Sequence, residues 1–372
     1  MKQNWQYKKL GDCFSSIGNG ANIKQFTPAD GFPITRIETL SNNNFNRDKL
    51  GYANIFDISK YSNYILENGD ILMSHINSIK YLGRAVLYKK NNNETIIHGM
   101  NLLRLVPISN IVTSTFVQFL FKSFYFRSQI LRIAKKAVNQ ASFTTSDLKK
   151  LIIPIPPLSE QERIVVELDL LSGIIEKQKQ QLKELDTLAQ SIFYSMFGDP
   201  ITNEKNWEFK FFKDFFQLKS GDGLSEKNFI KGDFPVYGGN GISGFHNSYN
   251  KSGNHIIIGR VGVYCGNVRF VKGNFWLTDN AFDTYFDNNI FNYLFLCFLL
   301  NSVKLNQYAN HAAQPVISNI GLKNILIIAP PLSLQNQFAE KIEKIEKQKE
   351  AINKSIEETQ KLFDYTMDKY FG

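Results

Sequence analysis

A long helix pattern that occurs twice constrains this chain more than any other sequence feature. Pro156-Pro157-Leu158-Ser159 opens a proline-free run that ends at Gly198, and Pro330-Pro331-Leu332-Ser333 opens a second run that ends at Gly372. The two proline pairs are 174 positions apart, and so are the two glycines. Because an α-helix rises about 1.5 Å per residue, each run would form a helix roughly 60 Å long. The chain therefore contains two predicted rigid spacers of equal length.

The ends and the apolar spacing of these runs support the helix prediction. Ser159 with Glu162 predicts a capping box at the start of the first helix, and Gly198 predicts its end. Apolar residues recur at alternating steps of three and four, which is the pattern of a coiled-coil seam. The predicted seam residues of the two helices are Leu168, Leu171, Ile175, Leu182, Leu185, Ile342, Ile345, Ile352 and Ile356.

The segments before the two helices also repeat. Asn4-Trp5-Gln6-Tyr7-Lys8 at the N-terminus corresponds to Asn206-Trp207-Glu208-Phe209-Lys210 after the first helix. The middles of the two globular segments have no sequence that can be aligned. We expect the shared frames to perform one common task and the middles to perform two different ones. The predicted order is globular segment, helix, globular segment, helix, with boundaries at 1–155, 156–200, 201–329 and 330–372.

Each globular segment mixes strand and helix patterns. The predicted fold class is α+β, with two mixed α/β domains separated by two long helices in an internal pseudo-twofold repeat. In the first segment we predict strands at 32–40, 70–73, 83–89 and 100–106 and a helix at 115–136. In the second we predict strands at 234–237, 255–263, 267–271 and 283–286 and a helix at 290–306.

The formal net charge of +9 lies in the globular segments. Residues 1–155 carry 20 Lys and Arg against 9 Asp and Glu, residues 201–330 carry 12 against 9, and both helices are net negative. This distribution is expected if the globular segments meet a polyanion while the helices meet protein. For the second segment alone, ordinary solubility charge is the simpler explanation.

The remaining composition favours a soluble protein of the reducing cytoplasm. Cys13, Cys265 and Cys297 are isolated, so neither a disulfide framework nor a zinc site is suggested. The longest apolar run, 293–300, is too short to span a bilayer, and the first twenty residues contain no apolar signal segment.

Two short motifs look like cofactor or catalytic signatures but lack the required context. Gly239-Asn240-Gly241-Ile242-Ser243-Gly244 fits a dinucleotide fingerprint, yet neither a helix pattern nor an acidic residue at the right spacing follows, so we predict a tight loop. Glu208-Phe209-Lys210 could be half of a nuclease site, but no paired acidic residues accompany it, and a surface strand is the simpler interpretation. We expect no catalytic residue, no metal site and no cofactor in this chain.

Polar and aromatic residues in Gly-rich loops are the candidate DNA contacts, because such side chains read base edges and hold phosphates. Each one alone is more simply explained as structural, but as a set in basic segments they favour DNA. The candidates in the first segment are Arg36, His75, Asn77, Ser78, Lys80, Arg84, Asn101 and Arg104. The candidates in the second segment are Tyr237, Asn240, His246, Arg260, Arg269, Asn280 and Gln314.

The combined pattern resembles the specificity subunit of type I restriction–modification systems over essentially the whole chain. The residues that carry the resemblance are Asn139-Gln140, Leu148-Lys149 and Pro156 to Gln161, with their copies Gln314-Pro315, Leu322-Lys323 and Pro330 to Gln335. The segments Tyr237 to Gly241, Gly259 to Gly262 and Thr278 to Asn280 are similar to one class of target-recognition domain. Gly69 to Ser74 with Ile76 to Ser78 is similar to another, although related sequences often have Arg where this chain has His75.

The resemblance implies a noncatalytic subunit. Each target-recognition domain would read one half of a bipartite double-stranded DNA site in the major groove. The two helices would form an antiparallel coiled coil that sets the gap between the half-sites and docks two methyltransferase subunits. Those subunits would supply S-adenosylmethionine for adenine N6 methylation, and motor-nuclease subunits would supply ATP- and Mg-dependent translocation and cleavage.

Two other classes of function stay open at this point. A DNA-modifying enzyme fragment would show metal- or S-adenosylmethionine-dependent activity when purified alone. A coiled-coil scaffold that does not bind DNA would show no salt-dependent binding to duplexes.

Overall fold

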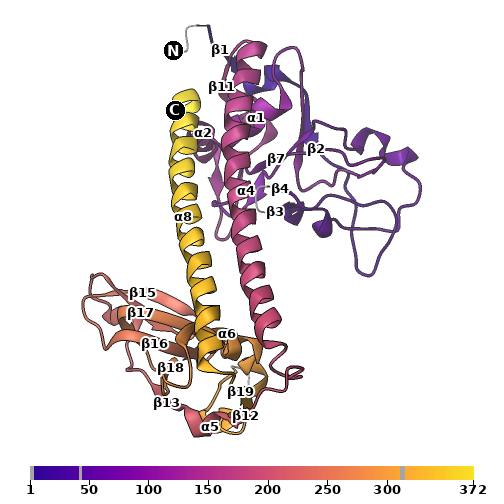
Figure 1. Ribbon diagram of the computed structural model, residues 1–372. Helices are drawn as coiled ribbons and strands as arrows, with labels where there is room; N and C mark the ends of the chain where they lie inside the picture. Colours follow the sequence, from indigo (N-terminus) through magenta and orange to yellow (C-terminus); the bar gives the residue numbers. More distant parts are fainter. Residues whose placement is uncertain (1–3, 42–43, 311–314) are drawn as a thin grey trace. The chain divides into compact units, whose positions relative to one another are not determined.

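The computed structural model describes residues 4–41, 44–310 and 315–372, which form two compact units (Figure 1). Unit 1 consists of Met1–Lys177 and Ile356–Gly372, and unit 2 consists of Gln178–Ser355. The helices α4 (Leu158–Phe197) and α8 (Leu332–Phe371) each contain 40 residues and contribute one part to each unit. Their equal length confirms the prediction made from the proline and glycine spacing.

Unit 1 is built on a four-stranded antiparallel sheet. Its strands, in spatial order, are β2 (Phe14–Asn19), β8 (Leu103–Pro107), β5 (Ile71–Met73) and β7 (Ala85–Leu87). Successive side chains of a strand point to opposite faces of the sheet. Ile71 and Met73 therefore join the main core with helix residues, whereas Leu72 joins a smaller cluster with Val86 and Tyr88.

Two helices, not one, follow β8. The helices α1 (Ser114–Lys122) and α2 (Phe124–Ile133) are separated by Ser123, whose backbone is extended and whose Oγ accepts a hydrogen bond from the Phe126 N–H at 3.1 Å. The prediction of a single helix over 115–136 is therefore wrong, because Ser123 ends one helix and caps the next. The end of that range, β9 (Lys135–Lys136), is a strand that pairs with β10 (Ala141–Ser142).

Unit 2 contains a six-stranded sheet, antiparallel except for one parallel pair, β14 with β17. Its strands, in spatial order, are β13 (Gln217–Ser220), β18 (Ala281–Tyr285), β16 (Lys251–Gly259), β17 (Val268–Leu277), β14 (Phe234–Gly238) and β15 (Gly241–His246). The helix α6 (Tyr293–Ser302) packs on β16 and β17 and buries Phe295 and Leu299 against Ile256 and Ile258. Gly241 begins a strand and not the helix that a dinucleotide fingerprint would open.

The two units share a frame that extends beyond the repeated sequence. The order β2-β8-β5-β7 of unit 1 recurs in unit 2 as β13-β18-β16-β17, and the β14–β15 hairpin is added at one edge. Short ribbons precede each long helix. They pair β1 (Gln6–Lys9) with β11 (Ile152–Ile155) and β12 (Phe209–Phe211) with β19 (Leu326–Ile328). The middles of the globular segments therefore have one strand order although their sequences cannot be aligned.

Several short elements complete the two units. The remaining strands and short α-helices are β3 (Leu40–Ser41), β4 (Asn44–Phe45), β6 (Ile76–Asn77), α3 (Thr145–Lys149), α5 (Phe212–Phe215) and α7 (Asn319–Leu322). The 3-10 helices are η1 (Leu10–Cys13), η2 (Ile37–Thr39), η3 (Arg47–Lys49), η4 (Ser59–Tyr64), η5 (Glu226–Asn228) and η6 (Leu305–Tyr308). The predicted strand at 32–40 is wrong, since Ile34 makes only isolated bridges and η2 occupies the end of that range.

A buried glutamine explains why the proline motif is repeated. The Oε1 of Gln161 accepts a hydrogen bond from the Thr113 N–H at 2.9 Å, and its Nε2 donates to the carbonyls of Ile111 and Pro156, each at 2.9 Å. Gln335, 174 positions later, makes the same three kinds of bond. Its partners are the Asn292 N–H at 2.9 Å and the carbonyls of Ile290 and Pro330 at 2.9 and 2.8 Å. Both side chains are fully buried.

The start of α4 differs from the predicted capping box. The helix begins at Leu158, so Ser159 lies inside the first turn, and the carbonyl of Pro157 accepts hydrogen bonds from the N–H groups of Glu160 and Gln161. The capping-box prediction is wrong because the proline carbonyl and the buried glutamine organise this end. At the other end, Gly198 has a positive φ of 74° and donates its N–H to the Tyr194 carbonyl, as predicted for a C-terminal glycine.

Within unit 2, α4 and α8 run antiparallel. Gln178 bonds Ser355 at 2.7 Å, Asp186 pairs with Lys349 at 2.8 Å, and the Phe193 and Phe338 rings lie 5.6 Å apart. As the residue numbers increase along α4, the numbers of their partners on α8 decrease, which shows that the two helices run in opposite directions. Within unit 1, Tyr370 of α8 donates a hydrogen bond to Glu167 of α4 at 2.5 Å.

Candidate nucleic-acid interface

Each unit carries an exposed loop of the same construction, which connects two neighbouring strands of its sheet. We call Ser74–Arg84, which joins β5 to β7, the tyrosine loop of unit 1. The Ser74 N–H donates to the Arg84 carbonyl at 2.9 Å, and the Gly83 N–H donates to the Ser74 carbonyl at 2.8 Å. The Arg84 N–H donates to the Tyr81 carbonyl at 3.2 Å. These bonds close the loop at its base and fix the tyrosine in a turn.

The tyrosine loop of unit 2, Gly259–Asn267, joins β16 to β17 and repeats these bonds. The Gly259 N–H donates to the Asn267 carbonyl at 2.9 Å, and the Gly266 N–H donates to the Gly259 carbonyl at 2.8 Å. The Asn267 N–H donates to the Tyr264 carbonyl at 3.2 Å. Tyr81 and Tyr264 therefore occupy equivalent positions in the two units.

A second segment lies beside each tyrosine loop. In unit 1, β6 pairs with β10, and the Phe143 N–H donates to the His75 carbonyl at 3.2 Å. In unit 2, Val261 bridges Val316, and the Ile317 N–H donates to the Arg260 carbonyl at 2.8 Å. Phe143 and Ile317 are 174 positions apart, so this pairing belongs to the repeated frame.

The tyrosine loop of unit 1 is basic and rigidly supported. The Arg84 guanidinium lies 4.3 Å from the Tyr81 ring centre, and the Lys80 ammonium lies 5.5 Å from it. Below the loop, Arg127 donates hydrogen bonds to the carbonyls of Ile79 and Leu82. The Tyr81 ring is 38% exposed. A cationic aromatic platform of this kind suits contact with phosphates and base faces.

The β9–β10 hairpin extends the basic surface of unit 1. Lys135 and Lys136 are exposed on β9, and the Ala137 N–H closes the hairpin by donating to the Gln140 carbonyl at 2.7 Å. Val138 at its tip is 99% exposed. Because β10 also pairs with β6, the hairpin and the tyrosine loop belong to one surface.

The structure uses some of the candidate residues of unit 1 for internal contacts. Arg104 pairs with the buried Asp70 at 2.7 Å, and burial raises the pKa of Asp70 although its hydrogen bond from Glu67 and the Arg104 charge oppose the rise. His75 is only 8% exposed, and burial lowers its pKa. Its Nδ1 has no hydrogen-bond partner among the residues that the structure describes. Asn77 holds the loop by bonding Ser74 and accepting from the Ser78 N–H.

The other candidates of unit 1 lie nearer to solvent. Lys80, Arg36 and Asn101 are exposed, whereas Ser78 and Arg84 are half-buried. Arg84 also donates to the Leu40 carbonyl at 3.2 Å, which fixes its guanidinium beside the Tyr81 ring. The structure therefore brings Ser78, Lys80 and Arg84 together on one loop and leaves Arg36 and Asn101 on other segments.

Unit 2 has a recess beside its tyrosine loop. A cavity of about 360 Å³ is lined by the loop Gly238–Gly241 together with Ser225, Thr278 and Asn280. A β-carbon on Gly259 would lie 2.3 Å from the Gly239 carbonyl oxygen, and Gly241 has a positive φ of 99°. Glycine is therefore required for the close packing of these loops and for the turn. The exposed Asn240 and Asn280 present amide groups beside this recess.

Other candidates in unit 2 are held by the protein itself. His246 is buried and its Nδ1 accepts a hydrogen bond from the Ile230 N–H at 3.0 Å. Arg269 donates to the Asn240 carbonyl at 3.3 Å, and Arg260 donates to Ser220 at 3.1 Å. Tyr237 packs edge-on against Phe275, and burial raises its pKa. Gln314 lies outside the described residues.

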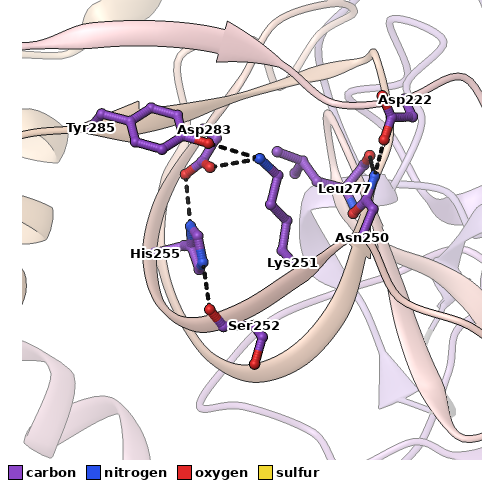
Figure 2. A network of polar contacts seen from close by, with 8 residues as sticks. All are labelled: Asp222, Asn250, Lys251, Ser252, His255, Leu277, Asp283 and Tyr285. Atoms are coloured by element: carbon purple, nitrogen blue, oxygen red, sulfur yellow. Dashed lines mark hydrogen bonds and ion pairs between the residues drawn. The ribbon is translucent and has the colours of Figure 1, made fainter.

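A network of hydrogen bonds and ion pairs connects side chains of the unit 2 sheet (Figure 2). Asp283 is fully buried; its Oδ2 pairs with Lys251 at 2.9 Å and its Oδ1 with the His255 Nδ1 at 2.9 Å. Lys251 also donates to the Tyr285 hydroxyl at 3.0 Å. Burial alone would raise the pKa of Asp283, but the hydrogen bonds from His255 and Lys251 lower it, and the bond to Asp283 raises the pKa of His255.

This network joins strands β16 and β18. Nearby, Asn250 bonds Asp222 at 2.8 Å and exchanges two hydrogen bonds with Leu277, which tethers the loop after β13 (Figure 2). We interpret both sets of contacts as structural.

The predicted seam residues differ in burial along the helices. Leu168, Leu171, Ile175, Ile342 and Ile345 are buried, whereas Leu182, Leu185, Ile352 and Ile356 are half-buried. Their role in a spacer stays a prediction.

Within residues 4–41, 44–310 and 315–372, no group of three or more His, Cys, Asp or Glu side chains is placed to hold a metal ion. In the same part of the chain, no helix is long and apolar enough to cross a membrane. The three cysteines are free thiols. Glu208 and Lys210 form an ion pair with each other at the surface ribbon of β12.

Sequence reasoning did not single out Tyr81, Tyr264 and the lysines of β9 as candidate interface residues. The signal was present but weak. It consists of a tyrosine two residues before a glycine, in Tyr81-Leu82-Gly83 and Tyr264-Cys265-Gly266, shortly after β5 and β16. The loops differ in length by two residues, so they align only when their hydrogen bonds are known.

Two repeated α+β units that share two long helices of equal length, each unit with an exposed tyrosine loop, define the class of protein to which this chain belongs. The chain matches the sequence profile of the type I restriction modification DNA specificity domain over residues 2–186 and 204–360, and it belongs to that family.

Relatives of known name agree with this family. The chain is 34% identical over 206 residues to a putative type I restriction enzyme MjaX specificity subunit from Methanocaldococcus jannaschii, covering 55% of this chain and 48% of that protein. It is 28% identical over 242 residues to the EcoprrI specificity subunit from Escherichia coli, covering 60% of each. The match thus spans about half of the length of these relatives.

A solved structure has the same fold. The S subunit of a type I restriction–modification system from M. genitalium superposes with a TM-score of 0.63 at 17% identity, covering 99% of this chain and 96% of that one. The resemblance stated from the sequence is therefore confirmed at the level of family and fold.

Proposed function

We propose that this chain is the DNA-recognition subunit of a type I restriction–modification complex, in which each unit reads one half of a bipartite site. One observation carries the proposal: the two units share a sheet frame and a tyrosine loop but differ in the side chains that surround the loop. Unit 1 surrounds it with Lys80 and Arg84, and unit 2 with Asn240 and Asn280. Two unlike readers on one frame fit two unlike half-sites.

The chemistry of the exposed groups suits DNA. Lysine and arginine bind phosphates, arginine also reads guanine, and asparagine can read adenine with both amide atoms. Lys80, Lys135 and Lys136 of unit 1 are exposed on adjacent segments. We assign the phosphate contacts of this half chiefly to these lysines.

The division of labour follows the sequence repeat. In this proposal residues 1–155 and 201–329 are the two target-recognition domains, and residues 156–200 and 330–372 form an antiparallel coiled coil that spaces them. The antiparallel contacts of α4 and α8 inside unit 2 support such a spacer. Since a helix rises about 1.5 Å per residue, a longer pair of helices should widen the gap between half-sites.

The helices also offer surfaces for partner subunits. Val166, Leu170 and Ile174 are exposed apolar residues spaced four apart on α4, and such a stripe is expected to be covered by protein. We propose that two methyltransferase subunits dock on the helices. They would supply S-adenosylmethionine, and motor-nuclease subunits would supply ATP and Mg-dependent cleavage. This chain would have no catalytic activity of its own.

Salt-dependent duplex binding tests the proposal. The full chain, purified with its methyltransferase partner, should bind duplex DNA more tightly than the methyltransferase alone, and its binding constant should fall steeply with salt. Equal binding with and without the chain would favour a coiled-coil scaffold. Methylation or cleavage by the chain alone, dependent on S-adenosylmethionine or metal, would favour an enzyme fragment.

A further inference from the structure

Each tyrosine loop exposes a tyrosine and an aliphatic side chain that shortly precedes it. Tyr81 is 38% exposed and Ile79, two residues before it, is 39% exposed. Tyr264 is 52% exposed and Val263, directly before it, is 86% exposed. An aromatic and an aliphatic side chain are thus presented together on each unit.

The loops are built to hold these side chains rigidly. Gly83 and Gly266 have positive φ values of 75° and 88°. A β-carbon on Gly83 would lie 2.8 Å from Ile130 Cγ2, and one on Gly266 would lie 2.4 Å from the Asn306 backbone nitrogen. Glycine at these positions lets each loop turn closely onto the helical layer beneath it. The exposed residues are therefore fixed by backbone contacts rather than by burial of their own side chains.

An internal comparison argues against accidental exposure. Around the tyrosines the loops share little: unit 1 has His75, Lys80 and Arg84 where unit 2 has Arg260, Val263 and Asn267. The tyrosine and the glycine two residues after it are retained in both loops, and each loop also exposes an aliphatic side chain shortly before the tyrosine, Ile79 or Val263. Side chains that differ between the units suit half-site reading, whereas side chains that are retained suit a task common to both half-sites.

We infer that Tyr81 and Tyr264 are a matched pair of DNA wedges, each packing its ring, with the adjacent aliphatic side chain, against a base step of its own half-site and opening that step. This inference rests on the proposed function and deepens it. DNA-binding proteins of the minor groove frequently insert apolar side chains between bases and unstack that step. Stacking of an aromatic ring on a base is largely independent of sequence. The cations Lys80 and Arg84 beside Tyr81 supply charge complementarity to the backbone.

The loop of unit 2 is placed beside the amide groups of that unit. The Arg260 N–H donates to the Asn280 carbonyl at 2.9 Å, and Gly259 packs on Gly239. Tyr264 would therefore enter the DNA next to the bases that Asn240 and Asn280 contact. A wedge at this position would widen the groove for the reading side chains without itself selecting a base.

The test uses the full chain with its methyltransferase partner on a duplex that contains the recognised site. The fluorescent adenine analogue 2-aminopurine, which brightens when unstacked, replaces in turn each adenine of either strand within and beside both half-sites, except the methylated adenines. The parent complex should brighten the probe at one step in each half-site. Tyr81→Ala should abolish the signal in one half-site and Tyr264→Ala in the other, each with roughly tenfold weaker binding.

Conservative and control variants separate a wedge from a structural role. Tyr81→Phe and Tyr264→Phe should keep the signal, because the ring and not the hydroxyl packs on the bases. Tyr52→Ala and Tyr249→Ala, which remove tyrosines of similar exposure elsewhere on units 1 and 2, should leave signal and affinity unchanged. Each variant is first required to co-purify with the methyltransferase.

Three outcomes would overturn the inference. They are an unchanged probe signal in both Ala variants, equal loss in both half-sites from either variant, and loss in the Phe variants as large as in the Ala variants. If the parent complex binds the site no better than the methyltransferase alone, the proposed function fails as well. Site-specific binding by the parent without any probe signal would overturn the wedge while leaving DNA recognition intact.

Discussion

Unit 1 and unit 2 each hold a buried carboxylate between equivalent central strands, but the acid and the base exchange places. In unit 1 the acid, Asp70, directly precedes β5 and its partner Arg104 lies on β8. In unit 2 the acid, Asp283, lies on β18, the counterpart of β8, and its partners Lys251 and His255 lie on β16. The two units therefore share their strand order but place their buried charged side chains on different strands.

The pKa shifts differ accordingly. Burial outweighs the single arginine and raises the pKa of Asp70, whereas Lys251 and His255 outweigh burial and lower the pKa of Asp283.

By contrast, Gln161 and Gln335 make the same hydrogen bonds to backbone in both units. The glutamines, which bond backbone groups, are therefore the same in both units, whereas the buried carboxylates, which bond side chains, have different positions and partners in the two units.

The largest effect is expected from breaking the helix pair on which both units depend. Leu182 and Ile352 lie between the contacts Gln178–Ser355 and Asp186–Lys349, so they face each other in the antiparallel pair of unit 2. Replacing both with Asp would place two charges in a half-buried seam. We expect loss of site-specific methylation and of the folded assembly, measured by circular dichroism and by co-purification with the methyltransferase.

A matched control for this prediction is Gln181→Asp, which adds one charge at an exposed position of α4. It should leave folding and methylation unchanged. A Leu182→Asp, Ile352→Asp chain that stays folded and site-specific would contradict the seam.

The second-largest effect is expected from replacing the buried glutamines, which tests whether they stabilise both units equally. Gln161→Leu and Gln335→Leu each leave buried backbone groups without partners, which should lower the free energy of unfolding by roughly 3 kcal/mol in the affected unit. Denaturant unfolding followed by unit-resolved hydrogen exchange measures this. The exposed Gln181→Leu is the control, and a large effect in one unit only would break the proposed equivalence.

A smaller effect is expected from the side chains that differ between the tyrosine loops. Arg260→Ala should weaken recognition of only the half-site read by unit 2, by about tenfold if the guanidinium contacts a base. His75→Ala, at the equivalent position of unit 1, should affect discrimination less, because the ring is buried. Methylation of site variants altered in one half at a time checks this, and equal loss at both halves from Arg260→Ala would count against separate readers.

The smallest expected effect is an opposite pH dependence of the two units. Burial lowers the pKa of His98 in unit 1 to about 4 from an ordinary 6.5, so its contribution to stability is present above pH 6.5 and is lost as the pH falls toward about 4. Asp283 raises the pKa of His255 in unit 2, so that contribution is present below pH 6.5 and is lost as the pH rises through the folded pKa.

Hydrogen exchange between pH 5 and pH 8 should therefore show unit 1 losing protection and unit 2 gaining it as the solution is acidified. His255→Gln should remove the gain in unit 2 and leave unit 1 unchanged. Parallel changes in both units would contradict the assignment of these histidines.

The long-range frame of the molecule could be predicted from the sequence because it depends on local signals repeated at a fixed distance. The proline pairs, Gly198 and Gly372 bound both long helices correctly. The capping box at Ser159 could not be excluded, since the competing role of Gln161 depends on Thr113 and Ile111, which are distant in sequence. Ser123 broke a predicted helix for a local reason, its side-chain cap, which the apolar pattern concealed.

The candidate interface was harder to predict, because exposure depends on tertiary contacts. His75 and His246 look like loop residues in sequence, yet both are buried. Arg104 looks like a phosphate contact, yet it neutralises Asp70. Tyr81 and Tyr264 became comparable only when the hydrogen bonds of their loops placed them at one position of a shared sheet.

Single-molecule methylome sequencing tests the central claim most directly. Cells that express this chain with its methyltransferase partner are compared with cells that express the methyltransferase alone. The two-reader account predicts a new split motif with N6-methyladenine in each half, separated by a fixed gap. With both proteins expressed and associated, the absence of any new motif, or a continuous motif without a gap, would contradict the two-reader account.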